Sequence, residues 1–241
     1  HAERRLDTGT ADLLFFPTGG GKTEAYLGLT AFTLAIRRLQ GDVAGHSGEG
    51  GVGVLMRYTL RLLTAQQFQR AATLICACEV RRRELVAGGD HRWGATPFRI
   101  GMWVGGSVSA NKTQDAAQAL DDLKQTGWAK GASPTSLVAC PWCGRELDPK
   151  TDAKVHPQMW RTLITCGDPM GQCQFTARRS DGEGIPVVTV DEEIYRLLPD
   201  LVIATADKFA QLPWQGATTS LFGRVTRKCS RHGFRSGDLD V

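Results

Sequence analysis

The sequence predicts an α/β fold in which a parallel sheet is flanked by helices and a small zinc-ribbon-like subdomain is inserted. Three observations predict it. Short apolar runs alternate with helix-like stretches, a glycine-rich turn joins one such run to a helix, and four cysteines gather in a segment dense in glycine and proline. Alternating strands and helices are the pattern of a parallel sheet with right-handed crossovers.

Apolar runs without polar interruption indicate strands that are buried on both faces. We expect such strands at residues 11–16, 52–56, 98–104, 186–190 and 201–204. The intervening stretches predict helices over about 24–39, 64–85, 112–125 and 191–198. In the first helix the apolar positions are Ala25, Leu29, Phe32 and Ile36.

The second helix has a capping-box pattern at its expected start, with Thr64 as N-cap and Gln67 three residues later. The alternation of strands and helices stops after Gly106 and resumes at Pro186. We therefore divide the chain into a first α/β part, an inserted segment and a continuation of the α/β domain with a basic tail, over residues 1–106, 107–185 and 186–241.

The composition excludes several classes of protein. Hydrophobic residues make up 41% and charged residues 22%, which argues against a disordered or fibrous chain. No apolar run approaches the roughly 18 residues of a membrane span, and no secretory signal is visible, so we expect a cytoplasmic protein without membrane association. The first residue is not methionine, which suggests a piece of a longer chain. The net charge of +4 is compatible with nucleic-acid binding but does not distinguish it from other functions.

The turn Pro17-Thr-Gly-Gly-Gly-Lys-Thr23 lies between an expected buried strand and a helix. Glycines let backbone N–H groups turn toward phosphate oxygens, and a helix N-terminus adds its positive dipole end. Lys22 would reach the β- and γ-phosphates of ATP, and the Thr23 hydroxyl would bind Mg²⁺, so these two are the candidate catalytic residues. The expected nucleotide-binding residues are Thr18, Gly19, Gly20, Gly21, Lys22, Thr23 and Glu24.

Phe16 stands where the general phosphate-loop pattern has glycine, but Pro-Thr-Gly-x-Gly-Lys-Thr resembles the variant typical of superfamily 2 helicases. Three later segments resemble helicase motifs Ia, Ib and Ic: residues 57–67, Gly105-Gly106 and residues 204–209. All lie at carboxyl ends of expected strands, where open α/β sheets bind ligands. The resemblance implies a RecA-like domain that contacts nucleic acid through Thr59, Arg61, Gly105, Gly106, Thr205 and Lys208.

Residues 12–85 and 186–212 more closely resemble the DrmA family, the helicases of the DISARM anti-phage systems. This resemblance implies a bacterial ATP-driven DNA translocase. Its DNA would be single-stranded, or a duplex with a single-stranded end, and its protein partner would resemble DrmB. Two other classes stay open. One is a zinc-ribbon nucleic-acid binder on a P-loop scaffold that does not hydrolyse ATP, and the other is a P-loop NTPase that acts on protein.

Hydrolysis also needs an acidic motif that holds Mg²⁺ and positions water. Asp191, Glu192 and Glu193 follow an apolar run as such a motif would, but they precede motif Ic, whereas the family's acidic motif follows it. We therefore interpret Asp191 as the cap of a short helix. We expect the chain to stop before the Walker B residues, to bind nucleotide and to hydrolyse it poorly alone.

Cys140-Pro-Trp-Cys143-Gly144 is typical of a zinc knuckle, in which two thiolates point at one ion. Cys166 and Cys173 would complete a structural Zn²⁺ site, although their separation is wider than usual. Cys229 and His232 form a further pair with knuckle spacing, but no second pair is evident in the sequence, so metal binding there is left open. Seven cysteines without a secretory signal favour metal or free thiols over disulfides.

Several basic and aromatic residues are candidates for DNA contact, although packing or solvation is the more usual role of such residues. We interpret the basic run Arg81–Arg83 as the solvated end of a helix. The other candidates lie near the cysteines or in the tail: Trp142, Trp160, Arg161, Arg178, Arg179, Arg224, Arg227, Lys228, Arg231 and Arg235.

Overall fold

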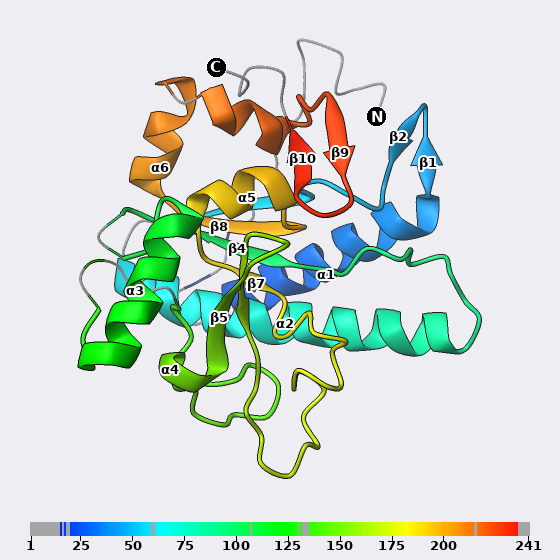
Figure 1. The fold of residues 1–241 in the computed structure, drawn as a ribbon. Coiled ribbons are helices and arrows are strands. Elements are labelled where there is room, and N and C mark those ends of the chain that lie inside the picture. Colours follow the sequence, from blue (N-terminus) through cyan, green and yellow to red (C-terminus); the bar gives the residue numbers. More distant parts are fainter. Residues whose placement is uncertain are drawn as a thin grey trace.

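The computed structural model describes residues 15, 17, 20–58, 61–106, 108–129, 131, 135–214 and 216–235, and of residues 61–65 only the backbone. Its centre is a parallel four-stranded sheet in the order β3-β8-β4-β7 (Figure 1). The strands are, in that order, Val54–Tyr58, Leu201–Thr205, Ile100–Trp103 and Val187–Val188. The predicted α/β fold with a parallel sheet flanked by helices is confirmed. The expected strand at 11–16 lies almost entirely outside the described residues.

The strand β8 lies between β3 and β4, and its side chains are inaccessible to solvent on both faces of the sheet. Leu201 and Ile203 belong to one hydrophobic core, and Val202 and Ala204 belong to the other. A strand covered on both sides needs an apolar residue at every position. This requirement explains why an unbroken apolar run predicted the strand correctly.

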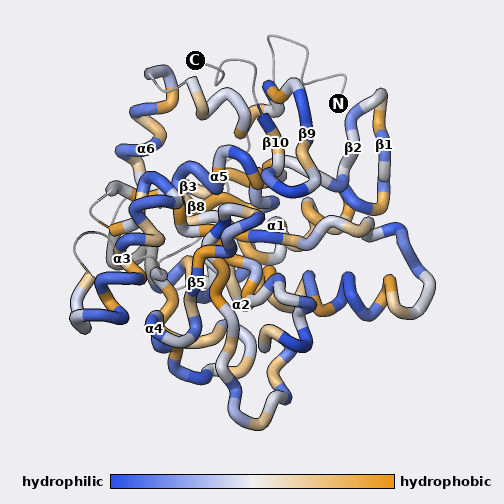
Figure 2. Tube along the Cα trace, in the orientation of Figure 1, coloured by the Kyte–Doolittle hydropathy of each residue, from blue (hydrophilic) through white to orange (hydrophobic). Residues whose placement is uncertain are grey.

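Helices cover the two faces of the sheet. The long helices α1 (Lys22–Gln40) and α2 (Arg61–Ala87) lie on one side, and α5 (Asp191–Leu197) lies on the other, with α6 (Ala206–Gln211) at the end of β8 (Figure 1). Figure 2 shows the hydrophobic segments gathered in the centre around β8, whereas outlying loops are largely hydrophilic. No helix in the described part of the chain is long and apolar enough to cross a membrane.

Shorter elements complete the fold. Residues 107–185, between β4 and β7, contain α3 (Thr113–Thr126), α4 (Pro149–Asp152) and the antiparallel strands β5 (Ala153–His156) and β6 (Arg161–Ile164). Two further antiparallel hairpins lie outside this segment. The remaining elements are β1 (Asp42–Val43), β2 (His46–Ser47), η2 (Leu212–Trp214), η3 (Gly216–Phe222), β9 (Arg227–Cys229) and β10 (Gly233–Arg235).

The helix α1 does not bury the face expected from its apolar residues. Leu29 and Phe32 are exposed, whereas Leu34 and Arg38 are buried. The reason is a distant partner: the Arg38 guanidinium donates to Asp200 Oδ1 at 3.0 Å, and it lies 4.2 Å from the Phe98 ring centroid. This buried pair fixes the rotation of the helix against the start of β8, which local periodicity cannot reveal.

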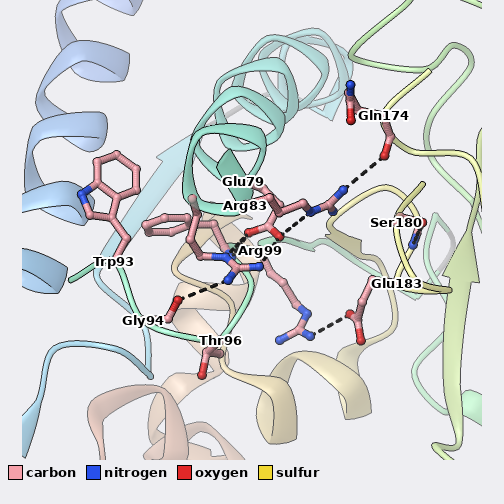
Figure 3. Close-up of polar contacts among 12 residues, drawn as sticks. Glu79, Arg83, Trp93, Gly94, Thr96, Arg99, Gln174, Ser180 and Glu183 are labelled. Atoms are coloured by element: carbon pink, nitrogen blue, oxygen red, sulfur yellow. Dashed lines mark hydrogen bonds and ion pairs between the residues drawn. The ribbon is translucent and has the colours of Figure 1, made fainter. Parts of the chain in front are cut away.

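Two other local expectations are wrong. The helix α2 begins at Arg61, so Thr64 lies inside it and does not cap it. Arg82 and Arg83 are not a solvated helix end, because both bind the buried carboxylate of Glu79, with Nε–O distances of 2.8 Å. Figure 3 shows Arg83 beside Glu79. Burial alone would raise the pKa of Glu79, but the two guanidinium groups outweigh it and lower the pKa.

The carboxylate of Glu183 joins the segment before β7 to two other parts of the fold. It accepts hydrogen bonds from Arg99, just before β4, at 3.0 Å and from Arg161 of β6 at 2.7 Å. Figure 3 shows the contact with Arg99. Burial opposes ionisation, but Arg161 and Arg99 outweigh it and bring the pKa of Glu183 down to about 2. The ion pairs therefore fasten the β5–β6 hairpin to the central sheet.

Candidate functional site

The glycine-rich turn ends where α1 begins. Gly21 is the N-cap of the helix in a left-handed conformation, with φ 77°, and Lys22 and Thr23 are the first two helical residues. The Gly20 N–H donates to the Pro17 carbonyl at 3.0 Å, which closes the turn. The first N–H groups of a helix have no intrahelical acceptor and can bind an anion. The candidate residues Thr18 and Gly19 lie outside the described residues.

The side chains at the start of α1 have protein partners. The Lys22 ammonium donates to the Pro17 carbonyl at 3.3 Å, back across the turn. Glu24 forms an ion pair with Arg70 of α2. A hydrogen bond from its own backbone N–H, followed by the bond from Arg70, lowers the pKa of Glu24. Glu24 is therefore a carboxylate at neutral pH and joins the two long helices beside the turn.

A large open groove lies at the carboxyl ends of β4 and β8, with a volume of about 1020 Å³. Gly105 and Gly106, which follow β4, line it together with Lys208 of α6. The structure thus brings together three of the six residues expected to contact nucleic acid. Of the others, Thr59 lies outside the described residues, and only the backbone of Arg61, the first residue of α2, is described.

The walls of this groove come from segments that are far apart in the sequence. The start of α3 contributes Lys112, α5 contributes Tyr195 and Arg196, and the β9–β10 hairpin contributes Phe234 and Arg235. Trp160 also lines the groove and is 40% exposed. The basic tail has no clear hydrophobic period, and nothing in the sequence singles out Tyr195, Arg196 or Phe234, because only the folded chain brings them together.

Lys208 lines the groove and is buried, whereas Thr205, the last residue of β8, is buried but does not line the groove. The Thr205 hydroxyl has no hydrogen-bond partner among the described residues. The Lys208 ammonium is 2.5 Å from Asp191 Oδ2, and its nitrogen is 5.9 Å from the Trp103 ring centroid. The charge of Lys208 is therefore neutralised inside the protein.

The acidic stretch at the start of α5 binds three different partners. Asp191 is the first residue of the helix and pairs with Lys208, so the expectation that it caps the helix is wrong; the N-cap is Val190. Glu192 Oε2 accepts from the Thr113 N–H at 2.8 Å. Glu193 is fully buried and accepts from the Thr162 N–H at 2.8 Å. Burial raises the pKa of both Asp191 and Glu193.

The four cysteines of the predicted metal site come together. Their sulfurs all lie within 4.8 Å of one another, with 3.8 Å between Cys140 and Cys173 and 3.6 Å between Cys143 and Cys166. Four thiolates about 2.3 Å from one Zn²⁺ in a tetrahedron would be about 3.8 Å apart, so the donor set fits this ion. Such a site is closed, because protein sulfur would occupy every coordination position.

The loop between the second pair of cysteines explains their wide spacing. Asp168 Oδ2 accepts from the N–H groups of Gln172 at 2.7 Å and Cys173 at 2.8 Å, which turns the chain back toward Cys166. Burial, followed by a hydrogen bond with Cys143, raises the pKa of Cys166 to about 12. A divalent cation would reverse this shift, since metal-bound thiols are deprotonated.

Comparison with known proteins gives one informative match. No family model matches the chain. The sequence is 42% identical over 236 residues to the DISARM protein DrmA of Bacillus paralicheniformis, a match that covers 95% of this chain and 20% of that protein. The chain thus spans about a fifth of the length of this relative. Over nearly its whole length, the chain is therefore similar in sequence to one part of a DISARM protein DrmA.

Proposed function

We propose that the chain is the ATP-binding core of a superfamily 2 type helicase or translocase that acts on DNA in DISARM anti-phage defence. In this proposal residues 1–106 and 186–241 form a RecA-like domain and residues 107–185 an insertion. The observation that carries it is the glycine turn, in which a left-handed Gly21 directly precedes a 19-residue helix that starts with Lys22 and Thr23. The similarity to DrmA supports the assignment to DISARM, and we further propose a protein partner that resembles DrmB.

The start of α1 would hold the triphosphate. The N–H groups that follow Gly20 and Gly21 would donate to phosphate oxygens, and the Lys22 ammonium would turn from the Pro17 carbonyl to the β- and γ-phosphates. The Thr23 hydroxyl would bind the Mg²⁺ that accompanies ATP. This ion would supply positive charge against the phosphates, while the protein residues orient them.

The groove would hold one DNA strand. Backbone at Gly105 and Gly106 allows close approach, and the exposed side chains of Lys112 and Arg235 would bind phosphates. Trp160 and Phe234 offer aromatic surface to bases. Because Asp191 neutralises Lys208, we assign Lys208 to shaping the floor of the groove and the buried Thr205, which directly precedes α6, to supporting it from behind. The strand β3 ends at Tyr58 at the same edge of the sheet, and we propose that Thr59 and Arg61, which follow it in the sequence, extend this path.

The four-cysteine cluster would bind Zn²⁺ as a structural ion. Arg83 connects this region to α2, because its guanidinium donates to the Gln174 carbonyl at 3.2 Å (Figure 3). The same guanidinium lies 5.1 Å from the Phe175 ring centroid. Three of the four cysteines are buried, so the ion would join the two parts of residues 107–185 that carry them. The proposed role is to hold residues 107–185 against the sheet.

ATP hydrolysis by the complete parent polypeptide, with and without single-stranded DNA, tests this function. We expect DNA to stimulate turnover and Lys22→Ala to reduce turnover to background, since its ammonium is proposed to bind the phosphates. Lys124→Ala is the matched control, because this exposed lysine of α3 lies outside the groove and the turn. A rate of ATP hydrolysis that DNA does not change would favour an NTPase that acts on protein. DNA binding that is independent of ATP would favour a nucleic-acid binder on an inactive scaffold.

A further inference from the structure

The β9–β10 hairpin repeats the sequence pattern of the four-cysteine cluster. There, Cys140 and Cys143 are followed by Gly144; here, Cys229 and His232 are followed by Gly233. Both glycines are left-handed, with φ 78° and 92° respectively. A Cβ at Gly233 would lie 2.2 Å from the carbonyl oxygen of Arg196, so no other residue fits without a shift of the backbone. The glycine after the second donor therefore has a left-handed φ at both places.

The two donor atoms of the hairpin converge on one point. Cys229 pairs with Gly233 across the strands, so Ser230, Arg231 and His232 form the tip. Cys229 Sγ lies 3.6 Å from His232 Nδ1. A sulfur about 2.3 Å and an imidazole nitrogen about 2.0 Å from one Zn²⁺ would be about 3.5 Å apart at the tetrahedral angle. The observed separation is close to the one that the ion requires.

The surroundings of the pair also suit a metal knuckle. The backbone N–H groups of His232 and Arg231 lower the pKa of the Cys229 thiol. The Arg231 side chain lies 3.2 Å from His232 Nε2. It is exposed and free to turn away when Nδ1 binds an ion and Nε2 carries the proton. Neither donor needs to move.

We propose that Cys229 and His232 are half of a second structural zinc site, separate from the four-cysteine cluster. Within the described ranges, only the four-cysteine cluster brings three or more donors together, so the other two ligands come from elsewhere in the protein. The relative is far longer than this chain, which leaves room for them.

Binding of zinc here would order one wall of the groove. The hairpin supplies His232, Phe234 and Arg235 to the groove. It is attached to α5 through the Arg196 guanidinium, which donates to the His232 carbonyl at 2.9 Å. The hairpin lies beside α5 (Figure 1). A closed metal knuckle at its tip would fix these side chains relative to α5.

The test is the zinc content of the purified parent polypeptide, measured by plasma mass spectrometry. We expect Cys229→Ser and His232→Ala each to lose about one zinc per chain, and His232→Cys to retain it because sulfur is also a zinc ligand. Cys78→Ser is the control, because this cysteine of α2 lies in neither knuckle. Cys140→Ser should lose a different equivalent, so that the double variant with Cys229→Ser loses about two. Unchanged zinc in Cys229→Ser and His232→Ala would overturn the proposal.

A second measurement decides the question if Cys229→Ser or His232→Ala fails to fold. The parent polypeptide and its His232→Cys variant are loaded with Co²⁺ in place of zinc. An added thiolate ligand increases the sulfur-to-cobalt charge-transfer absorption. We expect this increase in His232→Cys, and an unchanged spectrum would contradict metal binding by the hairpin.

Discussion

Lys208 and Asp191 form an ion pair from which solvent is nearly excluded, with side-chain exposures of 5% and 6%. Asp191 Oδ1 has no hydrogen-bond partner among the described residues, so the Lys208 ammonium supplies the positive charge that balances this carboxylate. Removing one partner of a buried pair leaves an uncompensated charge, which costs far more than the intact pair contributes.

We therefore expect Lys208→Met to lower the free energy of unfolding by about 3 kcal/mol, measured by urea denaturation. Asp191→Asn in the same chain should recover most of the loss, because the uncompensated charge is then absent. A single variant as stable as the wild type would show that Asp191 is not the main partner of Lys208.

Lys112 provides a test of the groove at the level of one side chain. It stands at the N-cap of α3 without a side-chain capping bond, so its truncation removes charge and leaves the helix start intact. On the proposed function, Lys112→Ala should weaken single-stranded DNA binding several-fold and reduce the salt slope by about one unit. Fluorescence anisotropy over a salt series measures both. Lys124→Ala, on the same helix, should change neither, and equal effects of the two would indicate non-specific charge.

At the scale of elements, the β5–β6 hairpin depends on ion pairs for its position. Glu183 binds Arg161 of the hairpin and Arg99 at the entry to β4. Its pKa is depressed from 4.5 to about 2, so its contribution to stability is present above pH 4.5 and is lost as the pH falls toward 2.

Glu183→Gln should therefore lower stability by about 1 kcal/mol at neutral pH, a small value because a third of the side chain is exposed and solvent screens the pairs. It should also flatten the decline in stability between about pH 4.5 and 2. Thermal melting over this pH range measures both effects. The same acid sensitivity in the variant and the wild type would assign the decline to other carboxylates.

Elements that are specified by their own residues could be predicted from the sequence. The run 201–204 in β8 is apolar at every position because both faces of the strand are covered. Cys140 and Cys143 are separated by two residues, and this spacing alone is enough to predict that their sulfurs point at one metal ion. Features that depend on distant partners could not. The rotation of α1 depends on Arg38 meeting Asp200, and the role of Asp191 depends on Lys208.

At the scale of the whole molecule, the groove illustrates the same limit. Its glycines follow a predictable strand, whereas nothing in the sequence assigns Arg196 or Phe234 to a binding surface. The β9–β10 hairpin has a basic sequence without periodicity, and its turn is specified by Gly233 against the Arg196 carbonyl. A turn that depends on a tertiary contact leaves little signal in local composition.

The strand order has a consequence for synthesis on the ribosome. The strands β3 and β4 are made early, but neither pairs with the other, since β8 separates them. Val54 can pair only after Leu201 has been synthesised, and Ile100 can pair only after Val187 and Leu201 have been synthesised. Such non-local pairing is slow, and apolar strands stay exposed until the late segment emerges. During translation, we therefore expect the incomplete chain to bind chaperones that cover exposed hydrophobic strands.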